Sequence, residues 1–303
     1  MIRGFFKTFL LISMMFAVQE GFAESSVENL YKTKLVHEFE SLQDLKSQAS
    51  KRKTAYIISG VLALLLLGLF AYFFKLFGVI AALIMIAAGY FTLKSSEPVV
   101  GAYEKAYAES LISPITNLSA GYSYHDKKPQ EKDLGNLFAP SIKNFSAWGS
   151  YTKENVTFSY IHVVFDTKEN ASVERMNQNI FDGYLITINR HTNSEGVLVS
   201  ESLRDSVSNM DMTMHSFFAK GKRAGKVSGF DVYGNVSQEE IDKVLPLQKL
   251  DIALSFEKDV IRIAFYKKSN PFSVGVFKTF DLSTAKSYES AVLEIEQIVQ
   301  IFQ

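Results

Sequence analysis

Four cations stand close together in the segment AKGKRAGKVSG, namely Lys220, Lys222, Arg223 and Lys226. Lysines among glycines are typical of phosphate-binding loops. Here, however, the spacing from Gly221 to Gly225 is one residue short of that pattern, and Val227 stands where a serine or threonine would bind magnesium. Near an anionic membrane surface each cation contributes about 1 kcal/mol. The segment is therefore either an ordinary solvated hairpin loop or a contact for anionic headgroups, and its four cations are the candidate site residues.

Methionines alternate in the segment NMDMTMHS, at positions 210, 212 and 214, with His215 beside them. Thioethers in such a pattern can hold Cu(I). On a strand, however, alternation directs all three side chains to one face, where a core uses methionine as adaptable filler. The other histidines show no metal-ligand spacing; they are His37, His125, His162 and His191. We predict no metal site and no cofactor, and we interpret His162 as a half-buried strand residue.

Acid–base chemistry would require two carboxylates brought together. The candidates in the C-terminal half are Asp166, Glu169, Asp182 and Asp205. Their linear spacing pairs none of them, and no G-x-S-x-G nucleophile turn is present. The only tryptophan, Trp148, is interpreted as a core anchor, with a ligand-stacking platform as the alternative. We predict no catalytic residues, and a non-enzymatic function is favoured.

The composition narrows the function classes further. The 303 residues carry 32 basic and 32 acidic side chains, so the formal net charge is +0. Such a chain has no global field that attracts nucleic acid, and no nucleic-acid partner is predicted. The absence of cysteine excludes disulfides, thiolate catalysis and cysteine-based metal sites.

The segment from Lys51 to Lys94 is apolar almost throughout. A bilayer core needs roughly 20 helical residues, and this run is about twice as long. We therefore predict a transmembrane hairpin with spans at Thr54–Phe74 and Leu76–Leu93 and with Lys75 in the turn. The protein is then expected to be a multi-pass protein of the bacterial inner membrane.

Two signals disagree about orientation. The lysines and arginine before the first span, with Lys94 after the second, favour cytoplasmic flanks by the positive-inside rule. The leader at residues 1–23 has basic residues, an apolar core and a small residue, Ala23, in the outline of a secretory signal peptide. A cleaved signal would put the C-terminal domain on the periplasmic side. The expectation is a cytoplasmic domain, with the periplasmic side as the alternative.

Amphipathic helices are expected on both sides of the hairpin. From Ser26 to Lys53 apolar residues recur at three- and four-residue steps. Pro98 to Leu118 repeats this spacing, with proline in an acceptable first turn. The polar segment Gly121 to Gly135 then indicates a domain boundary. The predicted divisions are a leader at 1–23, a helix at 24–53, the hairpin at 54–94, a helix and linker at 95–135 and a soluble domain at 136–303.

The period changes to two in the C-terminal domain. Strands are predicted in NVTFSYIHVVFDT and NIFDGYLITINRH, and further strands at 196–200, 211–217 and 229–233. Ser237 and Glu240 form a capping box that opens a helix, and Asp281 or Ser283 can cap a final helix. DIALSF and VIRIAFY form the clearest hairpin. This order predicts an α+β domain with a mainly antiparallel sheet.

These segments resemble a bacterial membrane family catalogued as domain of unknown function 3137. The residues that carry the similarity are Phe181, Asp182, Gly183, Phe230, Val232, Tyr233, Leu254, Phe256, Ile261, Ile263 and Ala264. The similarity extends from about Val27 to the C-terminus, while the leader departs from the family pattern. The resemblance implies two coupled spans and offers no catalytic residues.

The sequence thus leads to one main expectation and two alternatives. The main expectation is a non-enzymatic membrane protein whose α+β domain, held at the bilayer surface, binds a protein partner or assembles with copies of itself. One alternative is a membrane-tethered enzyme of unrecognised type. The other is a sensor of anionic lipid or envelope stress that uses the cationic segment. The predicted partners are accordingly the lipid bilayer and a protein partner or a second copy.

Overall fold

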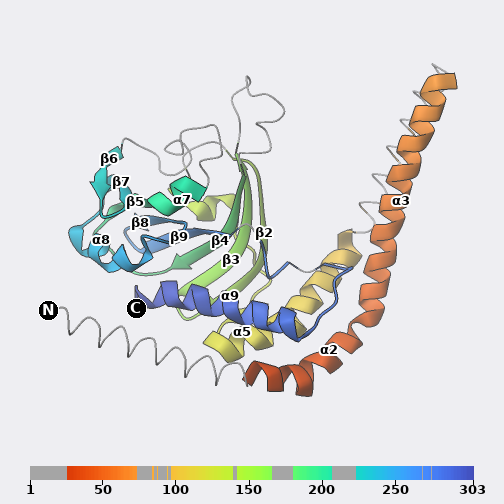
Figure 1. Ribbon diagram of the computed structural model, residues 1–303, viewed down its shortest axis with the longest axis horizontal. Coiled ribbons are helices and arrows are strands. Elements are labelled where there is room, and N and C mark those ends of the chain that lie inside the picture. Colours follow the sequence, from red (N-terminus) through yellow and green to blue (C-terminus); the bar gives the residue numbers. More distant parts are fainter. Residues whose placement is uncertain are drawn as a thin grey trace. The chain divides into compact units, whose positions relative to one another are not determined.

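The computed structural model describes residues 26–73, 97–138, 142–165, 180–206, 223–267, 269–273 and 275–303, with single positions at 84, 87 and 94 (Figure 1). The predicted leader, the second predicted span and the predicted strand at 211–217 therefore lie outside the described residues, apart from those single positions. The chain divides into two compact units. One comprises residues 1–114 with 274–285, and the other comprises residues 115–273 with 286–303.

The first unit is helical. It contains η1 (Tyr31–Leu35), α2 (Val36–Ser41), α3 (Gln43–Phe73), a helical stretch at 97–107 and η2 (Ala108–Ile112). The expected apolar stripes are buried at Val27 and Leu35 on one side and at Tyr103, Tyr107 and Leu111 on the other. Helix spacing of three and four residues puts these side chains on one face of each helix, and the rings of Tyr103 and Tyr107 lie 5.9 Å apart.

Phe280 joins this helical core from the far end of the sequence. Its ring lies 5.7 Å from the rings of Tyr31 and Phe39 and 6.0 Å from that of Tyr107, edge to face in the last case. The loop before the last helix is thereby fixed to the N-terminal helices.

The predicted transmembrane hairpin is wrong. In the part of the chain that the structure describes, no helix is both long enough and apolar enough to cross a membrane. The prediction rested on a continuous apolar run that is long enough for two spans. The helix that enters this run is α3. It begins at Gln43, includes the cations at 51–53 and is described only to Phe73. The predicted multi-pass inner-membrane localisation falls with the hairpin. Large apolar side chains of α3 between Ile57 and Leu65 are exposed.

The second unit is built on a nine-stranded sheet in the order β1-β2-β3-β4-β9-β8-β5-β7-β6. All neighbouring strands are antiparallel, as the α+β prediction expected. The strands are β1 (Ser123–Tyr124), β2 (Ile142–Lys153), β3 (Val156–Phe165), β4 (Ile180–Ile188), β5 (Glu195–Ser200), β6 (Arg223–Val227), β7 (Phe230–Asn235), β8 (Ile252–Glu257) and β9 (Val260–Tyr266). The predicted hairpin of β8 and β9 is confirmed.

The helices of this unit are α5 (Ser113–Ala120, whose first two residues belong to the first unit), η3 (Glu131–Leu134), α7 (Glu201–Ser206), α8 (Gln238–Val244), η5 (Leu245–Leu247) and α9 (Leu282–Gln300, whose first four residues belong to the first unit). Helix α9 crosses one face of the sheet (Figure 1). On that face Phe272 stacks on Tyr288 of α9 with ring centroids 5.7 Å apart, and it contacts Phe158 and Tyr184 of the sheet.

The opposite face of the sheet carries a second apolar core. Ile161 and Val163 of β3, Leu185 of β4 and Val197 of β5 are buried there with Phe138, which follows η3. Alternation along each strand sends successive side chains to opposite faces. Apolar side chains are thus buried on both faces of the sheet, and this explains why the central strands are apolar at most positions.

The predicted cap of α9 is confirmed, and the predicted capping box of α8 is confirmed only in its Ser237 half. The Ser237 hydroxyl accepts a hydrogen bond from the backbone N–H of Glu240 at the start of α8. The Glu240 side chain, however, does not complete a capping box, because it turns towards Thr192 and Arg190. Asp281, rather than Ser283, caps α9, since its Oδ1 accepts from the backbone N–H of Thr284 at 2.8 Å.

Candidate functional site

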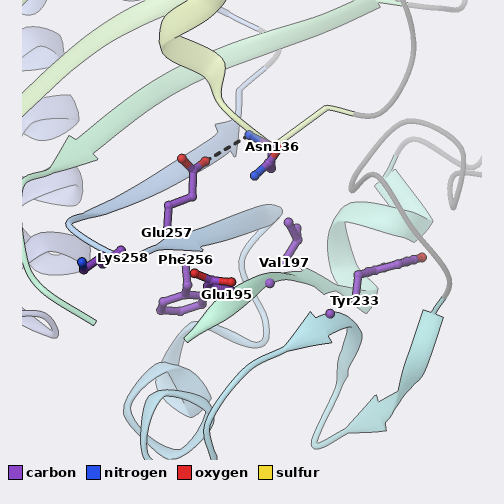
Figure 2. A pocket seen from close by; sticks show the side chains of 9 residues that line it. Asn136, Glu195, Val197, Tyr233, Phe256, Glu257 and Lys258 are labelled. Carbon is purple, nitrogen blue, oxygen red and sulfur yellow. Dashed lines mark hydrogen bonds between the residues drawn. The ribbon is translucent and has the colours of Figure 1, made fainter. Parts of the chain in front are cut away.

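A hollow of about 430 Å³ lies where strands β5, β7 and β8 come together at one end of the sheet (Figure 2). We call it the β5–β8 hollow. Its walls are formed by Asn136, Glu195, Gly196, Val197, Tyr233, Gly234, Phe256, Glu257 and Lys258. The size is within the range of small-ligand sites, which combine an apolar floor with a few fixed polar groups.

Two glycines lie in the wall of this hollow. Gly196 of β5 is paired with Gly234 of β7 on one side and with Phe256 of β8 on the other. A Cβ at position 196 would lie 2.4 Å from the backbone oxygen of Tyr233. Gly234 has a φ of 75°, which favours glycine, and a Cβ there would lie 2.8 Å from the backbone oxygen of Glu195. At positions 196 and 234 the backbones approach too closely for a side chain, so backbone atoms line this part of the hollow.

Glu257 is the most firmly held polar group of the hollow. Its Oε1 accepts hydrogen bonds from the backbone N–H of Asn136 at 3.1 Å and from the hydroxyl of Ser255 at 3.4 Å. The same oxygen lies 2.6 Å from Arg262 Nη1. Arg262 is itself fixed, because its Nε donates to the backbone oxygen of Asp133 at 2.8 Å. The charge of Glu257 is thus balanced within the fold.

Glu195 differs from Glu257 in this respect. The register of β5 and β8 pairs Gly196 with Phe256 and Val197 with Ser255, so one step further it brings Glu195 opposite Glu257. Glu195 is exposed and forms no ion pair with another described residue. Figure 2 shows the Lys258 ammonium directed away from Glu195. The hollow therefore has one carboxylate charge that no cation of its walls balances.

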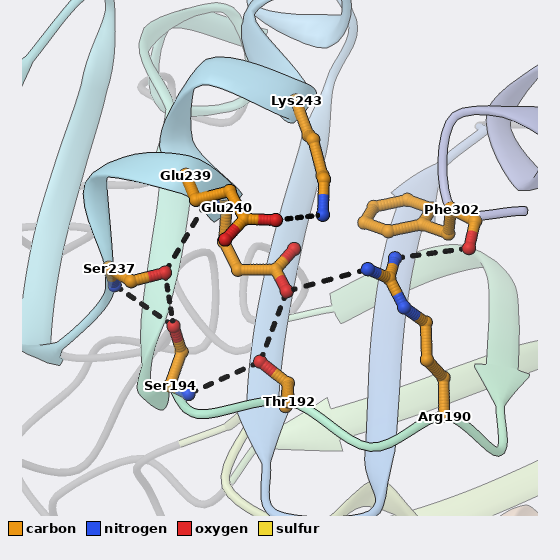
Figure 3. A network of polar contacts seen from close by, with 8 residues as sticks. All are labelled: Arg190, Thr192, Ser194, Ser237, Glu239, Glu240, Lys243 and Phe302. Carbon is orange, nitrogen blue, oxygen red and sulfur yellow. Dashed lines mark hydrogen bonds and ion pairs between the residues drawn. The ribbon is translucent and has the colours of Figure 1, made fainter.

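A polar network fixes the chain just before Glu195 (Figure 3). The Ser194 hydroxyl donates to Ser237 Oγ at 3.1 Å and accepts from the Ser237 backbone N–H at 2.9 Å. The Ser194 backbone N–H donates to Thr192 Oγ1 at 3.2 Å. These bonds join the start of β5 to the N-terminus of α8, and they hold the edge of the hollow in place.

Glu240 is the charged member of this network and is buried, with 5% of its surface exposed. Its Oε1 accepts from the Thr192 hydroxyl at 3.2 Å and lies 3.8 Å from Arg190 Nη2. Arg190 Nη1 donates to the backbone oxygen of Phe302 at 3.0 Å (Figure 3). A buried carboxylate beside a guanidinium that is bonded elsewhere is typical of a structural ion pair. We assign this network a positioning role, tying the C-terminus and α8 to β5.

The candidate cations of the sequence are only partly placed by the structure. Lys220 and Lys222 lie outside the described residues. Arg223 and Lys226 lie on β6 and form ion pairs with Asp231 of β7 and Glu201 of α7. Their contact with anionic headgroups stays a prediction.

The other sequence candidates fall in different places. The methionine segment at 210–214 with His215, and the carboxylates Asp166 and Glu169, lie outside the described residues. Asp205 is in α7 and Asp182 in β4, so these two carboxylates are on separate elements. Among the described residues no group of three or more histidine, aspartate or glutamate side chains is arranged to hold a metal ion.

His162 is half-buried on β3, as predicted, but it has a partner that sequence reasoning missed. Its Nδ1 lies 2.7 Å from Oδ1 of Asp182 on the neighbouring strand. Burial, and secondarily the charge of Asp182, raises the pKa of the nearby Tyr160 phenol above its ordinary value. Trp148, interpreted from sequence as a core anchor, is not in the buried core and is only half-buried.

The residues of the β5–β8 hollow were also missed. Asn136, Glu195 and Glu257 are separated by 59 and 62 positions, and no short motif links them. The strand register alone brings the two glutamates together, and the sequence fixes no register between β5 and β8. The one usable signal was the pair of glycines at 196 and 234, which interrupt apolar strands.

Comparison with protein-family models, with curated proteins and with solved structures returned no match. The fold and the hollow define an α+β protein with an antiparallel sheet and an acidic end-of-sheet hollow. The likeness to the family of domain of unknown function 3137 stays a prediction.

Proposed function

We propose that the sheet unit is a binding module and that the β5–β8 hollow receives a cationic group of a protein partner. One observation carries the proposal. Glu195 and Glu257 are at facing positions of two strands, and Arg262 balances only Glu257. A ligand cation placed beside Glu195 would balance its charge and gain a charge-assisted hydrogen bond.

The neighbouring contacts support a binding role. Because Glu257 Oε1 already accepts from Asn136 and Arg262, the rim is held in place before a ligand arrives. Pre-organisation of this kind reduces the entropy lost on binding. Val197 and Phe256 also line the hollow, and because both are buried they form an apolar part of its wall.

Binding is favoured over catalysis by the chemistry of the same walls. Hydrolysis by a carboxylate pair requires one carboxyl group to act as an acid and the other as a base or nucleophile. Glu257 is engaged with the Arg262 guanidinium and the Asn136 backbone N–H, so these contacts give it a structural role in the wall of the hollow. A binding function also agrees with the protein-interaction function that we expect from the sequence.

The proposal is tested with two small cations that mimic the side chains. Calorimetric titration of the full chain with n-butylguanidinium and n-butylammonium chloride should show weak binding, on the order of millimolar for probes of this size. The uncharged n-butanol should not bind. Glu195→Gln should weaken the binding at least tenfold, while Glu154→Gln, which removes an exposed carboxylate from the β2–β3 turn, should leave it unchanged. Equal binding by the protein and Glu195→Gln would refute the proposal.

A further inference from the structure

Three polar residues form a row across strands β2, β3 and β4, away from the β5–β8 hollow. The register pairs Ser146 with His162, and His162 with Asp182. Directly paired residues of antiparallel strands project from the same face, with Cβ atoms about 5 Å apart. The neighbours Ala147, Ile161 and Phe181 belong to the core on the opposite face. The row therefore lies on the face that carries α9.

The row is accessible. The side chain of His162 is 27% exposed and that of Asp182 is 32% exposed. A carboxylate can only accept hydrogen bonds, so His162 Nδ1 carries the proton in its 2.7 Å contact with Asp182 Oδ1. His162 Nε2 and the second oxygen of Asp182 are then available to a ligand, next to a half-buried serine hydroxyl.

An aromatic side chain borders this row. Trp148 is two residues from Ser146 on the same strand and therefore on the same face. Its ring lies edge-on to His162 with centroids 6.3 Å apart and is tilted against Tyr160 at 6.0 Å. Since Trp148 is only half-buried, part of its ring adjoins the polar row at the surface.

Two other chemistries fit these residues less well. Acyl transfer by a Ser-His-Asp arrangement needs a bond between the nucleophile and the base. Ser146 and His162, both within the described strands, form no hydrogen bond with each other. A phosphate-bearing ligand would need a cation, but Lys267, whose backbone N–H donates to the Asp182 backbone oxygen, is held by Glu294 at 2.7 Å. The row thus offers hydrogen-bonding groups without a cation for phosphate.

We propose that Trp148, Ser146, His162 and Asp182 form a binding site for a saccharide. The apolar face of a sugar ring can lie against the half-buried indole of Trp148, while its hydroxyl groups donate to Asp182 and exchange hydrogen bonds with His162 and Ser146. Two strand spacings, about 10 Å, separate the ends of the row, and this length fits a disaccharide. The site is independent of the cation-binding hollow.

The single tryptophan makes this site testable by fluorescence. Titration of the full chain with cellobiose, maltose and chitobiose should change the Trp148 emission saturably with at least one of them. Asp182→Ala and His162→Ala should weaken that binding at least tenfold. His191 and Asp259 provide the matched control, since they form an exposed pair at 3.0 Å elsewhere in this unit, and His191→Ala should bind as the unaltered protein does.

Nuclear magnetic resonance of the unaltered protein covers the case in which a variant does not fold. Saccharide binding should shift the backbone amides of Ser146, His162 and Asp182 and leave those of the β5–β8 hollow unshifted. Absence of any saturable change with all three disaccharides would overturn the proposal. A response to adenosine without a response to saccharides would overturn it as well, because it would assign the indole to base stacking.

Discussion

Arg262 Nη1 lies 2.6 Å from Glu257 Oε1 across the β8–β9 hairpin, and both side chains are largely shielded from solvent, with 15% and 28% of their surfaces exposed. The same carboxylate oxygen holds the Asn136 backbone, while Arg262 holds Asp133. This pair therefore joins the loop after η3 to the sheet and forms one side of the β5–β8 hollow.

Loss of this pair should destabilise the sheet unit. Glu257→Ala leaves the Arg262 guanidinium and the Asn136 N–H without their acceptor, and we expect a loss of about 2 kcal/mol in the free energy of unfolding in urea. Glu239→Ala removes an exposed ion pair with Lys243 instead and should have no measurable effect. Equal effects of the two substitutions would contradict the role assigned to the Arg262 pair.

Gly183 in the Phe181-Asp182-Gly183 segment should tolerate no side chain. A Cβ there would lie 2.1 Å from the backbone oxygen of Phe265 on the neighbouring strand, so the β4–β9 pairing must shift. We expect Gly183→Ala to lower the free energy of unfolding by about 2 kcal/mol or more. Gly225→Ala is the control, because a Cβ at position 225 meets no atom within 4 Å. A Gly183→Ala protein as stable as Gly225→Ala would disprove this explanation.

The sequence predicted some parts of this fold and not others. Local signals were sufficient where the physics is local, as in the β8–β9 hairpin, the Ser237 cap and the stripe of α9. The apolar run that α3 enters led to the wrong prediction of a transmembrane hairpin. A count of apolar residues does not show where a helix begins, which charged residues it includes or how far it extends. Glu195 and Glu257, like His162 and Asp182, meet only through strand pairing.

The cap of α9 should give an acid-dependent contribution to stability. Hydrogen bonds from the Thr284 hydroxyl, then from the Thr284 backbone N–H and then from the Ser283 hydroxyl lower the pKa of Asp281. Because the pKa is lower in the folded state, the contribution is present above the ordinary aspartate pKa and is lost as the pH falls through the lower, folded value. We expect Asp281→Ala to cost about 1 kcal/mol at neutral pH.

Thermal unfolding of the protein and Asp281→Ala over a series of acidic pH values measures this contribution. The difference between the two should shrink towards zero in strong acid. Asp281→Asn should keep most of the cap and show little of the pH dependence. A difference that stays constant down to strong acid would contradict the assigned cap.

Buried tyrosines should make the protein sensitive to alkali. Burial, with smaller effects of neighbouring Tyr124 and Glu294 respectively, raises the pKa of Tyr151 and Tyr184 above the ordinary value of 10.0. Their contribution is fully present below that value. It is lost as the pH rises from there towards the folded pKa, because the unfolded chain ionises first.

A spectrophotometric titration of tyrosinate, followed together with circular dichroism, checks the alkaline behaviour. Part of the tyrosinate signal should appear only as the sheet unfolds, and Tyr184→Phe should move that transition to higher pH if its packing is retained. Complete ionisation of all tyrosines near the ordinary pKa, with the fold intact, would contradict the burial of these phenols.

The most direct test of the cation-binding proposal is a nuclear magnetic resonance titration of the backbone amides with n-butylguanidinium chloride. We expect saturable shifts centred on Gly196, Gly234 and Asn136, and we expect these shifts to disappear in Glu195→Gln. Shifts spread evenly over exposed carboxylates, or shifts at the hollow that persist in Glu195→Gln, would contradict the account.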